Sequence, residues 1–325
     1  MDVECIIILC LIVLSIILNS IVVFVLVFHW KTLKNRDIIV LSLAVADLVQ
    51  SIFGFPYLIT DYGRPPSDPA TGKCIFSALI VTITAITAIC HIVSLSIVFC
   101  LFLNFPFIAE KFQYPLPSFL VFVLPCWLYG LLWAVMPLLG WSSYGKETDG
   151  GYRCGVNLRE HSFNVISYNL CLLFAACIIP VTITTICFFS VRSTFRNLER
   201  VAVERNGNES QLNQETRRQE FSLFVMSMIM FAAFMFAWFP YASFVIMTAF
   251  NNAPSQKLFD VAAILAKTSS FYNPIIYTFA YKEFRLKAFA IARKLTNQHR
   301  RVAALDLAER NSRLPSNAII QVTSN

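Results

Sequence analysis

The sequence predicts an all-α membrane protein, a seven-transmembrane helix bundle followed by a short amphipathic helix. Of the 325 residues, 57% are hydrophobic and only 14% are charged, whereas about a quarter of the residues in a typical soluble domain are charged. Seven apolar stretches are each long enough to cross a bilayer core about 30 Å thick. This composition excludes a cytosolic enzyme, a disordered chain and a protein that binds nucleic acid through a broad basic face.

Each of the seven stretches is bounded by charges or by turns rich in Pro, Gly and Asn. A buried soluble helix could account for one of them, but seven in succession leave no polar faces to cover a soluble body. The predicted spans are approximately Cys5–Phe28, Ile38–Tyr62, Cys74–Phe107, Ser118–Leu139, Asn164–Val191, Phe221–Phe250 and Leu258–Tyr281.

The basic residues predict how the chain is oriented in the membrane. If the N-terminus is outside, nineteen Lys and Arg residues fall on the inner side and six on the outer side. Cytoplasmic loops carry the excess of Lys and Arg in membrane proteins. We therefore expect a multi-pass protein of the cell membrane with its N-terminus outside and its C-terminus cytoplasmic. The inner cations also predict contact with anionic membrane lipids.

The residues after the last span predict two further segments. The run from Lys282 to Lys294 alternates cations with Phe and Ile, which is typical of an amphipathic helix on the inner membrane surface. The sequence that follows is polar. We therefore expect a seven-span domain with its surface helix over residues 1–294 and a flexible cytoplasmic tail over residues 295–325.

Two of the ten cysteines differ from the rest in their position. Most cysteines lie within predicted spans, where a free thiol behaves as a small hydrophobe. Cys74 and Cys154 stand at outer span or loop positions, on the oxidising side of the membrane. A disulfide between them can tie the third helix to the loop before the fifth.

Lys267 lies inside the seventh predicted span, about ten residues from its outer end and among small residues. A charged lysine at that depth is costly unless it is paired or neutral, so its presence indicates a function. One interpretation is a lysine that faces a water-filled cavity or an ion path. The other is a covalent site, because a neutral amine can condense with an aldehyde to form a Schiff base.

The surroundings of Lys267 resemble those of the opsins, a family within the rhodopsin-like G-protein-coupled receptors. Lys267 lies seven residues before Pro274 in the run Asn273-Pro274-Ile275-Ile276-Tyr277, which is the opsin spacing between the retinal-linking lysine and the NPxxY motif. Other motifs that resemble the family follow in its order, up to about Phe289. They are Asn19, Leu43-Ala44-Val45-Ala46-Asp47-Leu48, Cys74, Pro106, Trp127, Gly140-Trp141-Ser142-Ser143-Tyr144, Pro180 and Trp238-Phe239-Pro240-Tyr241.

The resemblance implies that retinal, as the 11-cis or the all-trans isomer, binds covalently to Lys267 as a Schiff base. It also implies that the third and sixth spans supply the walls of the retinal cavity, through Thr82, Ala85, Ile86, Phe234, Trp238 and Tyr241. Ordinary helix packing is the alternative for the three residues of the third span. Neither a catalytic residue nor a metal site is expected.

A visible pigment needs a protonated Schiff base, which requires a carboxylate nearby. Vertebrate visual opsins carry a Glu three residues after the third-helix Cys, and Ser77 occupies that position here. Many other opsins use a Glu three residues after the Tyr of the G-W-S-x-Y motif, which corresponds to Glu147. The resemblance therefore predicts Glu147 as the counterion.

Three other residues bear on the choice of counterion. Counted back from Cys154, the loop is one residue longer than the usual opsin spacing, which would put Thr148 in the counterion place and Asp149 next to it. Asp260 shares a helix face with Lys267, but seven residues of helix place it about 10 Å away. We expect Asp260 to be too distant for direct pairing.

The signalling motifs are matched only in part. Asp47, Asn273, Pro274, Tyr277 and Glu220 correspond to residues that act in receptor activation, with Asp47 in a polar network. At the inner end of the third span, the acidic-Arg-Tyr triplet of the family is replaced by Val98-Phe99-Cys100. The resemblance implies a heterotrimeric G protein and an arrestin-like protein as partners, but the missing charges weaken the expectation of coupling.

Several functions remain compatible with these residues. We expect a light-sensing receptor that signals when photoisomerisation rearranges the helices. A retinal photoisomerase or a non-coupling opsin is the alternative that the missing triplet favours. A receptor for a diffusible ligand would leave Lys267 incidental, and an ion pump would need a chain of acidic residues that the spans lack.

Overall fold

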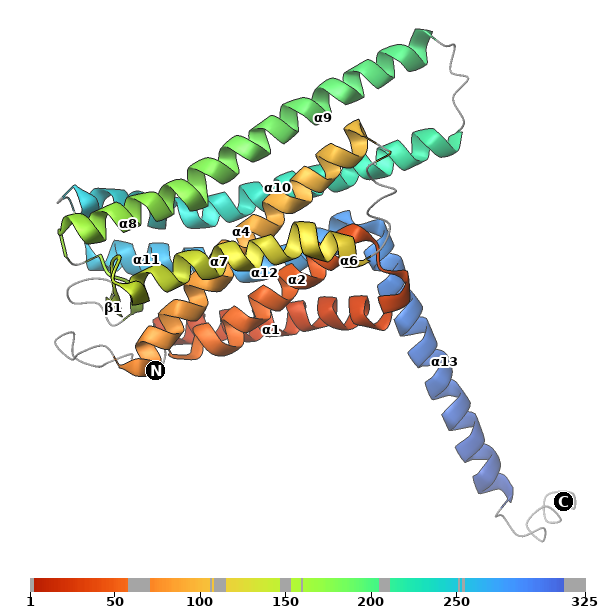
Figure 1. The fold of residues 1–325 in the computed structure, drawn as a ribbon. Helices are drawn as coiled ribbons and strands as arrows, with labels where there is room; N and C mark the ends of the chain where they lie inside the picture. Colours follow the sequence, from red (N-terminus) through yellow and green to blue (C-terminus); the bar gives the residue numbers. More distant parts are fainter. Residues whose placement is uncertain are drawn as a thin grey trace, which may run out of the picture. The chain divides into compact units, whose positions relative to one another are not determined.

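The computed structural model describes residues 3–57, 71–105, 107, 115–146, 153–158, 160–204, 211–250, 252 and 255–312. The chain divides into two units, Met1–Tyr281 and Lys282–Asn325, and the first unit holds a bundle of helices (Figure 1). The long helices of this unit are α1 (Val3–Phe28), α2 (Asn35–Val49), α4 (Gly72–Asn104), α7 (Leu124–Val135), α8 (Phe163–Leu173), α9 (Ile179–Glu204), α10 (Gln211–Ala249), α11 (Gln256–Lys267) and α12 (Ser269–Ala280).

Six of the predicted spans appear, within the described ranges, as helical stretches long and apolar enough to cross a membrane. The seventh predicted span is divided at Thr268 into α11 and α12, each of 12 residues, so neither half has that length alone. Both halves follow one another in the bundle, and the seven-helix membrane fold is as predicted. The helices α9 and α10 extend past the predicted apolar limits, because the Arg, Gln and Glu residues there are good helix formers.

Three short π-helical turns lie within the spans, and each ends two residues before a proline. A proline cannot donate the backbone hydrogen bond of the α-helix, and its ring clashes with the carbonyl of the preceding turn. A wider π-helical turn accommodates that clash. The three pairs are η2 (Gln50–Gly54) with Pro56, η3 (Phe119–Val123) with Pro125 and η5 (Phe174–Ile178) with Pro180.

Helix α4 occupies the middle of the bundle, where it packs against α2, α7, α9 and α10 (Figure 1). Its buried residues lie along most of its length, as expected for a helix surrounded by others. The large apolar side chains that remain exposed on α1, α7 and α9 face outward, in agreement with a lipid environment.

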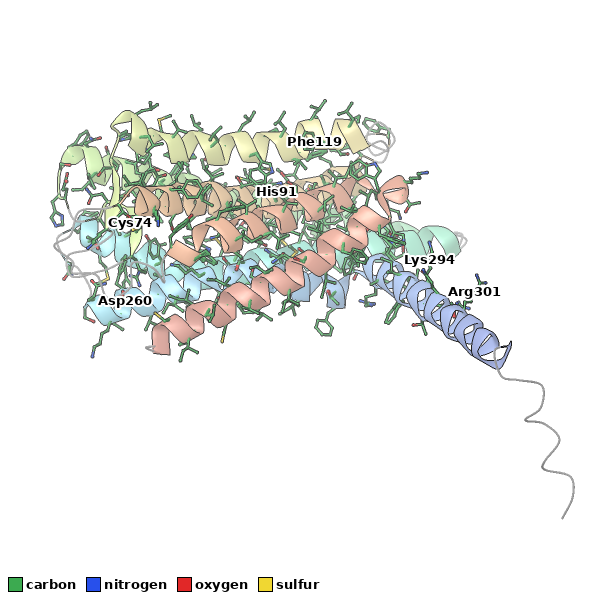
Figure 2. The ribbon with its side chains drawn as sticks, turned by 90° about the horizontal axis from the view of Figure 1, so that it is seen from below. Cys74, His91, Phe119, Asp260, Lys294 and Arg301 are labelled. Carbon is green, nitrogen blue, oxygen red and sulfur yellow. A yellow bond between two sulfur atoms is a disulfide. The ribbon has the colours of Figure 1, made fainter. Side chains whose placement is uncertain are left out.

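A small hairpin adds the one element of sheet among the described residues. Strand β1 (Tyr144–Lys146) pairs antiparallel with β2 (Cys154–Val156), with Tyr144 opposite Val156 and Lys146 opposite Cys154. The hairpin lies at the end of the bundle where α4 and α11 begin (Figure 1). We call this the hairpin end of the bundle. Cys74 and Asp260 both lie at this end, and His91 lies farther along α4 (Figure 2).

The second unit contains one described helix, α13 (Lys282–Ser312). The helix begins where the sequence predicts it, but it continues to Ser312 rather than ending near Lys294. The helix is thus longer than the sequence indicates, and the flexibility expected of residues 295–325 stays a prediction. Ala, Leu and Arg make up half of residues 295–312, and these residues favour helix even without an apolar face.

Candidate ligand-binding site

A cavity of about 150 Å³ lies within the bundle toward the hairpin end. Residues of α4, α8, α10, α11, η2, η5 and β2 form its walls. Thr82, Ala85, Ile86, Phe234, Trp238, Tyr241 and Lys267 all line it. The structure thus gathers around one cavity all the described residues that the sequence assigned to ligand binding.

Lys267 is the last residue of α11 and reaches the cavity wall half-buried. Its Nζ donates a hydrogen bond to the Ala263 carbonyl at 3.3 Å. Ala263 and Ala266 line the cavity beside it and are themselves buried. Their small side chains leave room next to the amine, so a ligand can approach Nζ from the cavity.

The interruption after Lys267 follows from its neighbours in sequence. The hydroxyls of Thr268 and Ser269 donate back to the carbonyls of the preceding turn, at 2.6 and 2.8 Å. Such bonds compete with the helix and bend it. Pro274 lacks the N–H that would bond to the Ser270 carbonyl. Asn19 Nδ2 donates to that carbonyl instead, at 2.9 Å, which ties the irregular region to α1.

Three aromatic rings on α10 form one wall of the cavity. Phe234 and Trp238 stack with their ring centroids 5.7 Å apart and an interplanar angle of 18°. Trp238 and Tyr241 meet edge to face at 5.8 Å. Spacings of four and three residues place all three rings on one helix face. Trp238 Nε1 also donates to Ser269 Oγ at 3.1 Å, so this wall is joined to α12.

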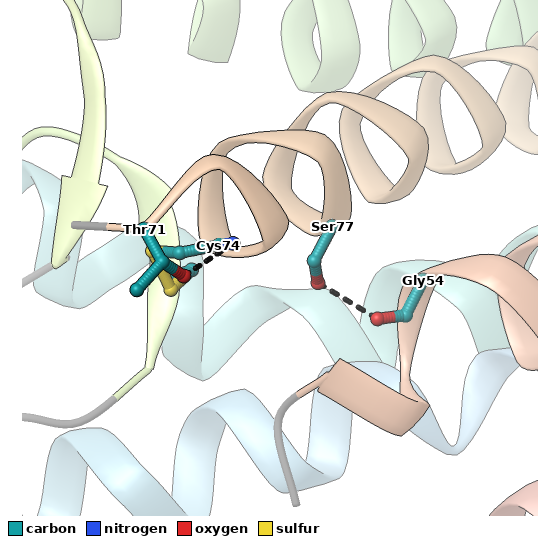
Figure 3. Close-up of a disulfide and its surroundings, with 5 residues drawn as sticks. Gly54, Thr71, Cys74 and Ser77 are labelled. Carbon is teal, nitrogen blue, oxygen red and sulfur yellow. Dashed lines mark hydrogen bonds between the residues drawn. A yellow bond between two sulfur atoms is a disulfide. The ribbon is translucent and has the colours of Figure 1, made fainter. Parts of the chain in front are cut away.

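The hairpin covers another side of the cavity. Cys154, Gly155 and Val156 line it, and a disulfide links Cys154 to Cys74 at the start of α4 (Figure 3). The predicted disulfide is therefore present. Tyr144, the first residue of β1, packs in a buried cluster, and its hydroxyl donates to the Ala134 carbonyl at 2.8 Å. Burial raises the pKa of Tyr144 to about 12.

An ion pair joins the same strand to α11. Arg153 precedes Cys154, and its guanidinium lies 2.6 Å from the Asp260 carboxylate. Only 2% of the Arg153 side chain is exposed. Gln256 Nε2 donates to the same carboxylate at 2.9 Å. Asp260 therefore serves to hold Arg153, in agreement with the expectation that it does not pair with Lys267 directly.

Ser77 stands at the position where vertebrate visual opsins carry a Glu. Its side chain makes a structural contact. Its hydroxyl donates to the Gly54 carbonyl at 2.7 Å, next to the disulfide (Figure 3). This bond joins α4 to the end of the π-helical turn η2. The cavity wall on this side is thus held by a neutral contact.

Comparison with known proteins decides the family. Residues 18–277 match the family described as 7 transmembrane receptor (rhodopsin family). The chain belongs to that family. Green-sensitive opsin-1 of Psalidodon fasciatus is 29% identical over 269 residues, which cover 76% of this chain and 68% of that protein. The structure of squid rhodopsin has the same fold, with a TM-score of 0.75 at 21% identity over 87% of this chain and 83% of that one.

Relatives of a second kind match a shorter part of the chain. The visual pigment-like receptor peropsin of Mus musculus is 26% identical over 174 residues, which are 54% of this chain and 50% of that protein. The chain thus spans about half the length of this peropsin. Together these relatives mark it as an opsin-type member of the rhodopsin family.

Several motif residues of the rhodopsin family meet in a buried polar network away from the hairpin. Asn273 Nδ2 donates to Asp47 Oδ2 at 3.1 Å, which joins α12 to α2. Ser51 Oγ donates to the Asp47 carbonyl at 2.8 Å and lies 2.8 Å from Ser15 Oγ on α1. Tyr277 is fully buried one turn beyond Asn273. The network thus ties three helices together at the level below the cavity.

The inner end of α4 departs from the rhodopsin-family pattern. Val98 and Phe99, which replace the acidic residue and the Arg, are each only 1% exposed. One turn further, Asn104 Nδ2 donates to Ser190 Oγ on α9 at 3.0 Å, and its Oδ1 accepts from the Thr194 hydroxyl. Apolar packing and neutral hydrogen bonds hold the region where the family usually places charges.

Two predicted residues cannot be placed in this arrangement. Glu147, with its neighbours Thr148 and Asp149, lies outside the described residues. Glu220 lies on α10, but its side chain is outside the part of the structure that is described. The counterion and the role of Glu220 stay predictions.

Three residues at or next to the cavity have no role predicted from the sequence: Gln50, Asn169 and Arg153. Arg153 was counted only as an outer cation, although its place beside Cys154 indicated a position near the third helix. Gln50 and Asn169 both line the cavity as buried amides. Gln50 lies three residues after Asp47 and so on the same helix face, a spacing that could have indicated it.

Proposed function

We propose that this chain is a light-sensing opsin of the cell membrane that binds retinal covalently through a Schiff base at Lys267. The observation that carries the proposal is the Lys267 amine at the wall of a cavity lined by aromatic and small side chains. Condensation would join the retinal aldehyde carbon to Nζ with loss of water. Bound in this way, retinal would supply light absorption and a change of shape.

The residues present suit such a ligand. A polyene is apolar and rigid, and the stacked rings of Phe234 and Trp238 offer it a flat wall. Ala85 and Ala266 give space without polar groups. The amine is the reactive group that an aldehyde requires, and the short side chains beside it leave it accessible from the cavity. The chemistry of the walls and of the amine thus favours retinal over a polar diffusible ligand.

A connected path supports signalling from this cavity. Trp238 bonds to Ser269 at the start of α12, and α12 carries Asn273, which bonds to Asp47 on α2. A change in what Trp238 contacts therefore acts on α12 and on the buried network. Two arrangements of these helices, of which the ligand favours one, would provide a receptor switch.

We infer that Glu147 is the counterion of the Schiff base. It directly follows Lys146, which pairs with Cys154 at the end of the hairpin that covers the cavity. The alternative acid on α11, Asp260, already binds Arg153 at 2.6 Å. Asp149, two residues farther along, is the remaining alternative and is tested in parallel.

The orientation and partners follow from the charge distribution and the family. Nineteen of the Lys and Arg residues lie on one side of the spans and six on the other, which supports an outer N-terminus and a cytoplasmic C-terminus. We propose retinal, inner-leaflet lipids, a heterotrimeric G protein and an arrestin-like protein as partners. On this view residues 1–294 form the receptor domain and residues 295–325 the cytoplasmic tail, with helix through Ser312.

The test is to express the full chain, add 11-cis or all-trans retinal, and record absorption spectra. We expect a visible band that Lys267→Ala abolishes and that Lys257→Ala, an exposed lysine on the same helix, leaves in place. Borohydride reduction should leave a retinyl group on the peptide that contains Lys267. If no adduct forms on that peptide, the proposal is wrong.

The counterion is tested on the same pigment. Glu147→Gln should shift absorption from the visible to the ultraviolet, because loss of the carboxylate lowers the pKa of the Schiff base. Asp149→Asn should leave the band in the visible. The reverse result would assign the counterion to Asp149.

A second candidate function is a retinal photoisomerase, or an opsin that does not couple to a G protein. The apolar, buried Val98 and Phe99 at the position of the charged triplet favour it. Illumination of the chain with added all-trans retinal would then give net conversion to another isomer and its release, without a second-messenger response. A light-dependent second-messenger change in expressing cells would instead support the receptor.

A further inference from the structure

The strand that covers the cavity is anchored on both sides. On one side, the disulfide of Cys154 attaches β2 to the start of α4. On the other side, Arg153 attaches the same strand to α11 through Asp260, at 2.6 Å. Cys154, Gly155 and Val156, which follow Arg153, line the cavity directly. Cys154, the first residue of β2, and Arg153, which directly precedes it, therefore form the two anchors.

The second anchor is buried and reinforced. Arg153 is 2% exposed, and its guanidinium lies 5.2 Å from the centre of the Phe259 ring, within the range of a cation–π contact. Gln256 donates to the Asp260 carboxylate at 2.9 Å and fixes its position. Removal of one member of a buried ion pair leaves the other uncompensated, which is strongly unfavourable. The pair therefore resists opening in the folded protein.

The position of the pair relative to Lys267 separates its role from that of a counterion. Asp260 lies seven residues before Lys267 on α11, a rise of about 10 Å along the helix. At that distance, with its carboxylate bound to Arg153, Asp260 acts on the position of the hairpin more than on the charge of the amine. Opening of the pair would release one of the two anchors at the start of β2, while the disulfide would keep the other.

We propose that Arg153 and Asp260 form a latch that holds β2 over the cavity and limits the exchange of water, small nucleophiles and ligand with Lys267. The proposal rests on the proposed function, because it concerns access to a Schiff base at that lysine. Arg153 and Asp260 are positioning residues: neither is expected to touch the ligand. The disulfide holds the start of β2 against α4, and the latch holds it against α11.

The test is the rate at which hydroxylamine reacts in the dark with the pigment of the full chain. Hydroxylamine attacks the imine carbon, forms the oxime of retinal and returns Lys267 as a free amine, so the decay of the visible band reports access. We expect Arg153→Gln and Asp260→Asn each to react about tenfold faster than the wild type, a coupling typical of directly interacting residues. Lys257→Gln, which removes an exposed charge from the same helix, should react at the wild-type rate.

A double variant and the spectra distinguish the latch from two independent effects. Arg153→Gln combined with Asp260→Asn should react no faster than either single variant, because each change already opens the same contact. The absorption maximum should stay that of the wild type in all of them. Arg153→Lys keeps the charge but loses the guanidinium over the Phe259 ring, so it should react faster than the wild type and more slowly than Arg153→Gln. If Arg153→Gln does not fold, the test relies on the isosteric Asp260→Asn and on Arg153→Lys.

Each other outcome overturns the inference. Wild-type rates in Asp260→Asn would show that the pair does not control access. An ultraviolet shift in that variant would make Asp260 a counterion instead of a latch. If the rate increases of the two single variants multiply in the double variant, Arg153 and Asp260 act independently and do not form one latch. A wild-type chain that forms no pigment would overturn the proposed function itself, whereas a wild-type pigment with unchanged variants would overturn the latch alone.

Discussion

Gly130 on α7 is the residue whose substitution should disturb the bundle most for the smallest chemical change. A methyl group added there would lie 2.3 Å from Thr87 Oγ1 and 2.6 Å from the Ile83 carbonyl oxygen, both on α4. The Thr87 side chain can rotate away, at the loss of its bond to the Cys126 carbonyl. The Ile83 carbonyl belongs to the backbone, so α4 and α7 must separate by several tenths of an ångström.

The size of the effect follows from two opposing contributions. Overpacking of a well-packed contact costs about 1–3 kcal/mol, of which the upper part, about 2–3 kcal/mol, applies to a clash with backbone, and the better helix propensity of Ala returns about 1 kcal/mol. Gly130→Ala should therefore destabilise the protein by about 1–2 kcal/mol. With about 2–4 °C per kcal/mol, the thermal midpoint of the purified chain in detergent should fall by roughly 2–8 °C.

Gly72→Ala is the matched control. Gly72 lies in the first turn of α4, and a methyl group there would meet nothing within 4 Å. The control should melt at the wild-type temperature or slightly above it, because Ala restricts the unfolded chain. If Gly130→Ala also melts at or above the wild-type temperature, the close approach of α4 and α7 at this glycine is refuted.

Three further predictions concern polar side chains that form hydrogen bonds. The pKa of Tyr144 is raised to about 12, so its stabilising contribution is complete below pH 10 and is lost as the pH rises toward 12; Tyr144→Phe should flatten that alkaline fall in the free energy of unfolding, and an unchanged profile would contradict it. Asn273→Ala should cost about 1–3 kcal/mol in thermal unfolding, because it leaves the Asp47 carboxyl without its amide partner; a cost near zero would show that the bond does not stabilise the bundle. Asn104→Ala should cost about 1–2 kcal/mol by the same assay through its lost bonds to α9, and Ser190→Ala about half as much.

The spans and the covalent candidate could be predicted because each rests on a local pattern. A membrane requires an unbroken apolar run, and such a run is visible in the sequence of α4 without knowledge of its neighbours. A lysine inside one of these runs, seven residues before the proline of an NPxxY motif, is equally local. The family resemblance indicates Trp238 and Tyr241, and helix spacing adds Phe234 to the same face.

The contacts between distant segments could not be predicted in this way. The link between the irregular region after Lys267 and α1 depends on Asn19, which lies far away in the sequence and donates to the Ser270 carbonyl that Pro274 leaves without a backbone N–H. The pairing of Arg153 with Asp260 depends on a strand and a helix that meet only in the folded bundle. The spacing of residues in the sequence does not indicate such a contact, because Arg153 and Asp260, each considered alone, are ordinary charged residues.

At the inner end of α4, the residues around the replaced triplet are also packed to suit apolar side chains. Val98 and Phe99 are each 1% exposed, so the bundle around them is shaped for apolar side chains. A single Phe99→Arg substitution would place a charge in that interior, where an uncompensated ion is expensive. Nearby, Asn104 ties α4 to α9 with neutral hydrogen bonds. The packing at this end of α4 therefore has no place for the family's arginine, and Phe99→Arg alone should lower the thermal midpoint of the protein.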